Sequence, residues 1–193
     1  SARYPFKMSE QHPITSAERV ARLLVDLAES DSDADQQPMC NMRLQKLLYY
    51  VQGWTLARLG RSAFPERIEA WAHGPVVPPI YKMLKHHGRH AVSPDELASA
   101  DDLDPDLRTF IASVWEEYRS YSAIQLRHRT HNETPWKNAW DKRTLSDRCD
   151  EVISEDDLRS FFEEHAAEGV RRYTERQPDA AWFDESSPFP ESA

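Results

Sequence analysis

The segment NMRLQKLLYYVQGWTLARLG, residues 41–60, decides the fold because it carries the strongest helix signal in the chain. Gly60 follows the last apolar residue, a position where glycine commonly ends a helix. Gly53, in the middle, costs a helix about 1 kcal/mol relative to alanine, which indicates close helix packing or, alternatively, the approach of a partner's backbone. Apolar residues recur along the segment at helical spacing and form one stripe: Leu44, Leu47, Leu48, Val51 and Trp54.

Further helices are expected on both sides of this segment. Before it, Thr15 and Glu18 have the spacing of a capping box, and an apolar stripe follows at Val20, Leu23, Leu24, Leu27 and Ala28. After it, we expect helices over residues 103–118 and 122–131, a turn around residues 136–140, and a last helix that Ser154 caps and that runs to about residue 176.

A short strand is expected at RIEAWAH, residues 67–73, because apolar and polar residues alternate there. One face would be buried, and the partner strand would lie near residues 63–64 or 91–92. Gly74 and Pro75 then end the strand, and Pro78 or Pro79 suits the first turn of a helix in which Ile80, Met83 and Leu84 face inward and which Gly88 closes. The sequence therefore predicts a mainly α (α+β) protein, a compact helical domain with a small β-strand or hairpin element.

Composition places the chain among single-domain globular proteins of cytoplasmic type. Charged residues make up 30% of its 193 residues and hydrophobic residues 39%. No apolar run approaches the ~20 residues that a membrane helix needs, and no secretory signal pattern is visible. The two cysteines, Cys40 and Cys149, have no motif spacing. Met8 is a candidate natural start, in which case residues 1–7 would be foreign to the chain.

The net charge of −9 is distributed unevenly. Residues 1–149 contain 20 acidic and 20 basic residues, whereas residues from Asp150 onward contain 13 acidic residues and four arginines. This balance argues against general attraction to nucleic acid. A DNA-binding regulator stays open as an alternative, because the segment SAIQLRHRTH, with Arg127 and Arg129, resembles a basic recognition helix.

Chemical motifs are incomplete. The five glycines form neither a phosphate loop nor a dinucleotide fingerprint. His86 and His90 have metal-ligand spacing on a helix, but Gly88 between them is expected to end that helix, so we expect no metal and no cofactor. His73 and His131 are candidates for acid–base catalysis, which leaves a hydrolase as a second alternative. His131 and Glu133 match half of a zinc deaminase motif whose cysteine half is absent.

Two sequence blocks, taken together, resemble a known family. LQKLLYYVQGWTLARLGRSAFPERIEAWAHGPVVPPIY and, further on, SAIQLRHRTHNETPW are similar to the SocA-like antitoxins with a Panacea domain, a family long described as phage-associated. The resemblance covers about residues 16–165. The chain departs from the family pattern at Ser62 and Ala63, where proline and leucine are usual. Residues 1–15 would then be an N-terminal extension, and residues 166–193 the end of the last helix and an acidic tail.

The resemblance implies a bacterial or phage antitoxin that is not an enzyme. Such a protein binds and neutralises a cognate toxin, and some members also hand the toxin to an ATP-dependent protease. The block from Trp71 to Pro78 is expected to be a rigid corner that serves as scaffold, as partner contact or, less well supported, as a catalytic site.

The expected partner-binding residues share an aromatic, histidine or turn character. Within the resembling region they are Tyr50, Trp54, Trp71, His73, Gly74, Pro75, Tyr81, His131 and Trp136. Trp182 and Phe183 extend the set into the acidic tail, where aromatic anchors between acids suit docking on a basic apolar groove. The alternative for these two residues is that they fold back onto the protein's own core.

Overall fold

A computed structural model of the chain describes residues 12–32, 37–141 and 151–176. The described residues form seven α-helices, two 3₁₀ turns and one hairpin, which confirms the mainly α fold class. In chain order the elements are α1 Ala17–Ser30, α2 Asn41–Leu59, β1 Glu69–Trp71, β2 Gly74–Val76, α3 Pro78–Leu84, η1 Lys85–His87, η2 Pro94–Glu96, α4 Pro105–Tyr118, α5 Ala123–Asn132, α6 Thr134–Asp141 and α7 Glu155–Arg176. Of the helices in these ranges, none is both long and apolar enough to span a membrane.

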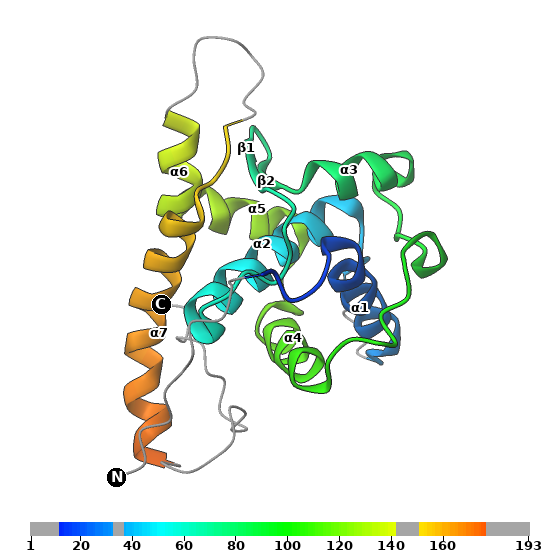
Figure 1. The fold of residues 1–193 in the computed structure, drawn as a ribbon. Coiled ribbons are helices and arrows are strands. Elements are labelled where there is room, and N and C mark those ends of the chain that lie inside the picture. Colours follow the sequence, from blue (N-terminus) through cyan, green and yellow to red (C-terminus); the bar gives the residue numbers. More distant parts are fainter. Residues whose placement is uncertain (1–11, 33–36, 142–150, 177–193) are drawn as a thin grey trace.

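Helix α2 is the centre of the molecule. It packs against α1, α3, α4, α5, α7 and β2, and Figure 1 shows it running between α7 on one side and α1 with α4 on the other. Every residue from 43 to 56 is buried. The predicted apolar stripe is therefore only one of its buried faces, and polar side chains of α2 must find hydrogen-bond partners inside the protein.

The two glycines of α2 behave as expected. Gly60 adopts a φ of 66° at the C-terminal cap, and its N–H donates to the carbonyl of Leu56. Gly53 lies directly beneath α7, where a Cβ atom would come within 2.1 Å of the Phe162 ring. Close packing between these two helices thus explains Gly53.

The strand expected within residues 67–73 is present as β1, but its predicted partner strand and its predicted half-burial are wrong. β1 pairs with β2, directly after it in the sequence, with Trp71 opposite Gly74. Its other edge contacts residues 151–153, where the N–H of Ala70 donates to the carbonyl of Glu151. Both edges have neighbours, and Glu69 (4% exposed) is buried as well as Ala70 (0%), so the strand does not alternate between a buried and an exposed face.

The two predicted partner segments pair elsewhere. The carbonyl of Ala63 accepts from the N–H of Thr15, and the N–H of Val92 donates to the carbonyl of Met39. Both segments therefore hold the ends of helices instead of extending a sheet.

Three local expectations also need correction. Ser16, not Thr15, caps α1 and accepts from the N–H of Arg19, while Glu18 bonds the N–H of Ala98 instead of closing a capping box. Residues 134–141 form a helix where a turn was expected, because Pro135 is compatible with a first helical turn. Met83 is 38% exposed, whereas Pro78, Ile80 and Leu84 are the buried residues of the short helix α3.

Candidate partner-binding surface

The β1–β2 hairpin ends in a two-residue tip formed by Ala72 and His73, both of which are exposed. Gly74 follows at a φ of 95°, a conformation that side chains with a Cβ rarely adopt. A Cβ there would also lie 2.6 Å from Cε of Lys46 and 3.0 Å from Oγ1 of Thr130. Gly74 therefore lets the hairpin press against α2 and α5 at once.

Side chains of α2 bind the backbone of the hairpin and of the segment behind it. Nζ of Lys46 donates to the carbonyl of Pro75 at 2.9 Å. Oε1 of Gln45 accepts from the N–H of Val77 at 2.8 Å, and Nε2 of Gln45 donates to Asn41. Buried polar bonds of this kind fix one arrangement, because an unpaired group would cost about 1–3 kcal/mol. The hairpin is thus held rigidly from below.

Aromatic rings line the surface next to the tip. Trp71 packs edge-on against Tyr81 of α3, with ring centroids 4.9 Å apart. The indole N–H of Trp136 donates to the carbonyl of Trp71 at 3.1 Å, which joins the hairpin to α6. Trp136 also stacks on His131, with ring centroids 4.1 Å apart, and on Trp140, with ring centroids 4.9 Å apart. The surface made by residues 71–75, Tyr81 and residues 127–140 is termed the hairpin corner below.

Positive groups gather at the hairpin corner. The pKa of His131 is lowered to about 4, first by burial and then by the neighbouring Arg127, Lys46, His128 and His73. Nε2 of His131 is buried and has no hydrogen-bond partner among the described residues. Burial is also the main reason why the pKa of Lys46 falls to about 7, and Arg127 adds to this effect. Acidic groups of another molecule would be attracted to Arg127 and would favour the protonated forms of Lys46 and His131.

One histidine of the hairpin corner, His131, fits the role of a general base poorly. A general base works best when its pKa lies near the pH of the reaction, and a His131 pKa of about 4 lies far below neutrality. Geometry and charge at this surface therefore suit binding better than proton transfer.

Tyr50 and Trp54 lie in the core and not on the surface of the hairpin corner. Both are buried, at 0% and 2% exposure. Tyr50 stacks on Tyr118 with ring centroids 3.9 Å apart, and the Trp54 indole donates to the Tyr118 hydroxyl at 3.0 Å. Contact of these two residues with a partner stays a prediction. In this structure both side chains pack in the core against Tyr118. Trp182 and Phe183 lie outside the described residues.

A buried carboxylate at the α5–α6 junction was missed from the sequence as a site residue. Glu133 accepts hydrogen bonds from Tyr49 at 2.8 Å and from Tyr50 at 2.9 Å, and Arg129 lies 3.8 Å away. Burial raises its pKa to about 7, although the two tyrosines and Arg129 oppose this rise. The sequence placed Glu133 only in an incomplete zinc deaminase motif, and it gave no signal for the contact with the tyrosines, which lie more than 80 positions away.

In the described part of the chain, the group of side chains whose ligand atoms lie close enough together for a metal ion is His86, His87 and Glu96, away from the hairpin corner. Gly88 ends the 3₁₀ turn η1 as expected, but His86 is not paired with His90. His86 and His87 both contact Glu96 instead, at the connection between α3 and α4.

Comparison with known proteins gives a consistent result. Residues 44–137 match the family model "Antitoxin SocA-like, Panacea domain". The chain is also 33% identical over 131 residues to "Antitoxin SocA" of Caulobacter vibrioides, an alignment that covers 62% of this chain and 68% of the relative. No solved structure matches the chain significantly. Both the hairpin and α5 lie inside the matched region.

Proposed function

The chain belongs to the SocA-like antitoxin family with a Panacea domain, and from this membership we propose that it is the antitoxin of a toxin–antitoxin pair. It binds a cognate toxin protein and neutralises it without catalysing a reaction. The cytoplasm is its proposed location, as composition suggested.

We place the toxin contact at the hairpin corner. The observation that carries this assignment is the combination of a rigid, backbone-tethered hairpin with an exposed tip and a gathering of positive groups. A surface that is ordered before binding loses little conformational entropy when a partner arrives. Half-buried Trp71 and Tyr81 supply the aromatic area that commonly dominates binding energy.

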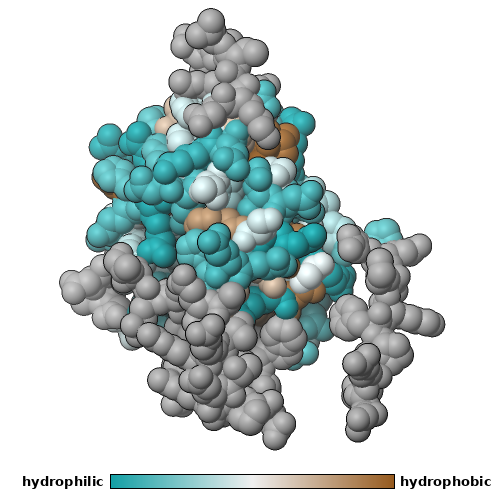
Figure 2. Space-filling view, turned by 90° about the vertical axis from the view of Figure 1, so that its left-hand side faces the viewer, coloured by the Kyte–Doolittle hydropathy of each residue, from teal (hydrophilic) through white to brown (hydrophobic). Residues whose placement is uncertain are grey.

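Charge indicates the chemistry of the toxin surface. Arg127, His128 and His73 lie close enough to lower the pKa of His131, so the toxin is expected to present carboxylates to them. The face that carries α6 and α7 is mostly hydrophilic, with only small separate hydrophobic patches (Figure 2). Since α6 belongs to the hairpin corner, a polar, charge-matched contact with the toxin fits the hairpin corner better than a broad apolar contact.

A matched pair of variants tests the location. His73→Glu combined with His128→Glu changes the net charge by −2 on exposed positions of the hairpin corner. Arg61→Glu changes it by −2 just after the far end of α2, where the exposed guanidinium donates to the carbonyl of His12. We expect the double variant to weaken toxin binding about tenfold, equivalent to about 1.4 kcal/mol, and Arg61→Glu to bind normally.

The measurement is calorimetric titration of the purified toxin encoded beside this protein, with circular dichroism as the control for folding. Equal affinity of all three proteins would remove the contact from the hairpin corner. Separate migration of toxin and unmodified protein on gel filtration at micromolar concentration would contradict toxin binding itself.

Delivery of the toxin to an ATP-dependent protease is a finer part of the proposal. It predicts that the toxin is degraded faster in the presence of this protein, in a reaction that contains the protease and ATP. Neutralisation without degradation would leave direct inhibition as the mechanism.

A further inference from the structure

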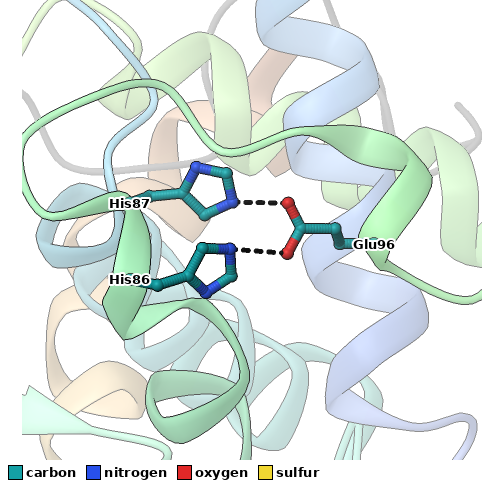
Figure 3. A group of neighbouring side chains, drawn as sticks. All are labelled: His86, His87 and Glu96. Carbon is teal, nitrogen blue, oxygen red and sulfur yellow. Dashed lines mark hydrogen bonds and ion pairs between the residues drawn. The ribbon is translucent and has the colours of Figure 1, made fainter.

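A cluster of three metal-ligating side chains lies on the connection between α3 and α4. Nε2 of His86 is 3.0 Å from one carboxylate oxygen of Glu96, and Nε2 of His87 is 2.6 Å from the other. Figure 3 shows both imidazole rings pointing at this carboxylate from the same side. One ligand atom from each residue lies within 4.8 Å of the other two.

Local backbone structure makes two adjacent histidines converge. His86 and His87 belong to the 3₁₀ turn η1, and their ring centroids are only 4.3 Å apart. Gly88, at a φ of 56°, then reverses the chain. The bond from the N–H of Val92 to the carbonyl of Met39 anchors the returning segment, so that Glu96 in η2 lies opposite the two rings.

We propose that His86, His87 and Glu96 form a binding site for a divalent transition-metal ion of the zinc class. Imidazole nitrogen and carboxylate oxygen are ligands that Zn²⁺ prefers, at about 2.0–2.2 Å. Ligand atoms around such an ion are about 3–4 Å apart, so small side-chain rotations suffice to admit it. Three protein ligands leave a fourth position for water or for a group of another molecule.

Ion binding requires a specific tautomer of each ring. Both Nε2 atoms must be free of protons to ligate, so each neutral imidazole carries its proton on Nδ1 in the bound state. Glu96 contributes one oxygen as a carboxylate.

A bound metal ion would cross-link two parts of the connection between α3 and α4. The ion would link η1 to η2, and the N-terminal residue of η2, Pro94, already accepts a hydrogen bond from Arg22 of α1 at 3.0 Å. Because the site exists only in the folded chain, metal binding would stabilise the protein in proportion to the logarithm of metal concentration. This property is independent of toxin binding.

The test uses the full chain, first treated with a chelator and then titrated with Zn²⁺ by calorimetry, and with Co²⁺ by visible absorption. We expect one ion per chain and a rise in melting temperature with added Zn²⁺. His87→Ala and Glu96→Gln should each weaken binding at least tenfold. His90→Ala is the matched control, since His90 lies in the same loop but outside the cluster, and it should bind normally.

Circular dichroism before the titration shows that each variant is folded; His86→Ala replaces any variant that is not. A weak surface site would have a dissociation constant on the order of 100 μM. Absence of binding to the unmodified chain at this Zn²⁺ concentration would therefore overturn the proposal. So would binding that survives both cluster variants, or binding that is lost in His90→Ala.

Discussion

Gly53 shows how one residue sets the distance between two helices. Its missing side chain lets the Phe162 ring of α7 lie against the backbone of α2. Phe162 also packs edge-on against Tyr49, Tyr50 and Trp54. Helix propensity alone would favour alanine at this position, so packing overrides propensity here.

Gly53→Ala is therefore expected to destabilise the fold by about 2–3 kcal/mol, because overpacking outweighs the gain in helix propensity. Urea unfolding followed by circular dichroism measures this loss. Phe162→Leu should relieve the collision, so the double variant should be less destabilised than the sum of the two single variants.

Gly60→Ala is the matched control, because it meets no atom within 4 Å but sits at a φ of 66°. It should cost about 1 kcal/mol through backbone strain alone. Additive effects of Gly53→Ala and Phe162→Leu would contradict the proposed steric cause.

At the scale of elements, the α5–α6 junction carries a buried acid whose protonation affects stability. Glu133 faces Tyr49 and Tyr50 from α2 and Tyr118 from α4, while Arg129 and His165 act on it from α5 and α7. Its pKa is raised from 4.5 to about 7. Between these values the folded state holds a proton that the unfolded state has released.

The contribution of Glu133 to stability is therefore fully present below pH 4.5 and is lost as the pH rises to about 7. Glu133→Gln removes this dependence. We expect the free energy of unfolding of the unmodified protein, minus that of Glu133→Gln, to fall between pH 4.5 and 7. His131, whose pKa is lowered, titrates with the opposite sign but cancels in this difference. A difference that stays constant over this range would mean that Glu133 does not titrate there.

On the scale of the whole molecule, charge argues against a role in DNA binding. Residues 1–149 are neutral overall and the acidic excess lies after them. Arg129, one of two arginines expected on a recognition helix, instead lies over the rings of Tyr118 and Tyr121 at about 5.5 Å. Its positive charge is thus engaged with α4 and the segment after it.

We accordingly expect no shift of promoter DNA by this protein alone at physiological salt in a gel-mobility assay, since phosphate contacts depend steeply on free positive charge. Arg127→Ala is the informative variant, because Arg129 supports the core. A sequence-selective shift that Arg127→Ala abolishes would instead establish DNA binding.

The sequence by itself determined those features that depend on neighbours within a few turns of the chain. The apolar stripe of α2, its end at Gly60, a proline (Pro78 or Pro79) in the first turn of α3 and the existence of α5 were all predicted. Each follows from periodicity or from a local hydrogen bond. For Gly53 the sequence left two explanations open, and the contact with Phe162 supports close helix packing.

Only the tertiary structure decided which distant groups meet. Lys46 finds the carbonyl of Pro75 29 positions away, and Tyr49 finds Glu133 84 positions away. β1 gained a second neighbour at residues 151–153, and His86 gained Glu96 in place of His90. These contacts depend on how helices cross and where loops return, which local propensity does not encode. Because every face of α2 is buried, its polar side chains must hydrogen-bond to groups inside the protein. Lys46 and Gln45 therefore bind the backbone of Pro75 and Val77, and these bonds hold the hairpin corner in place.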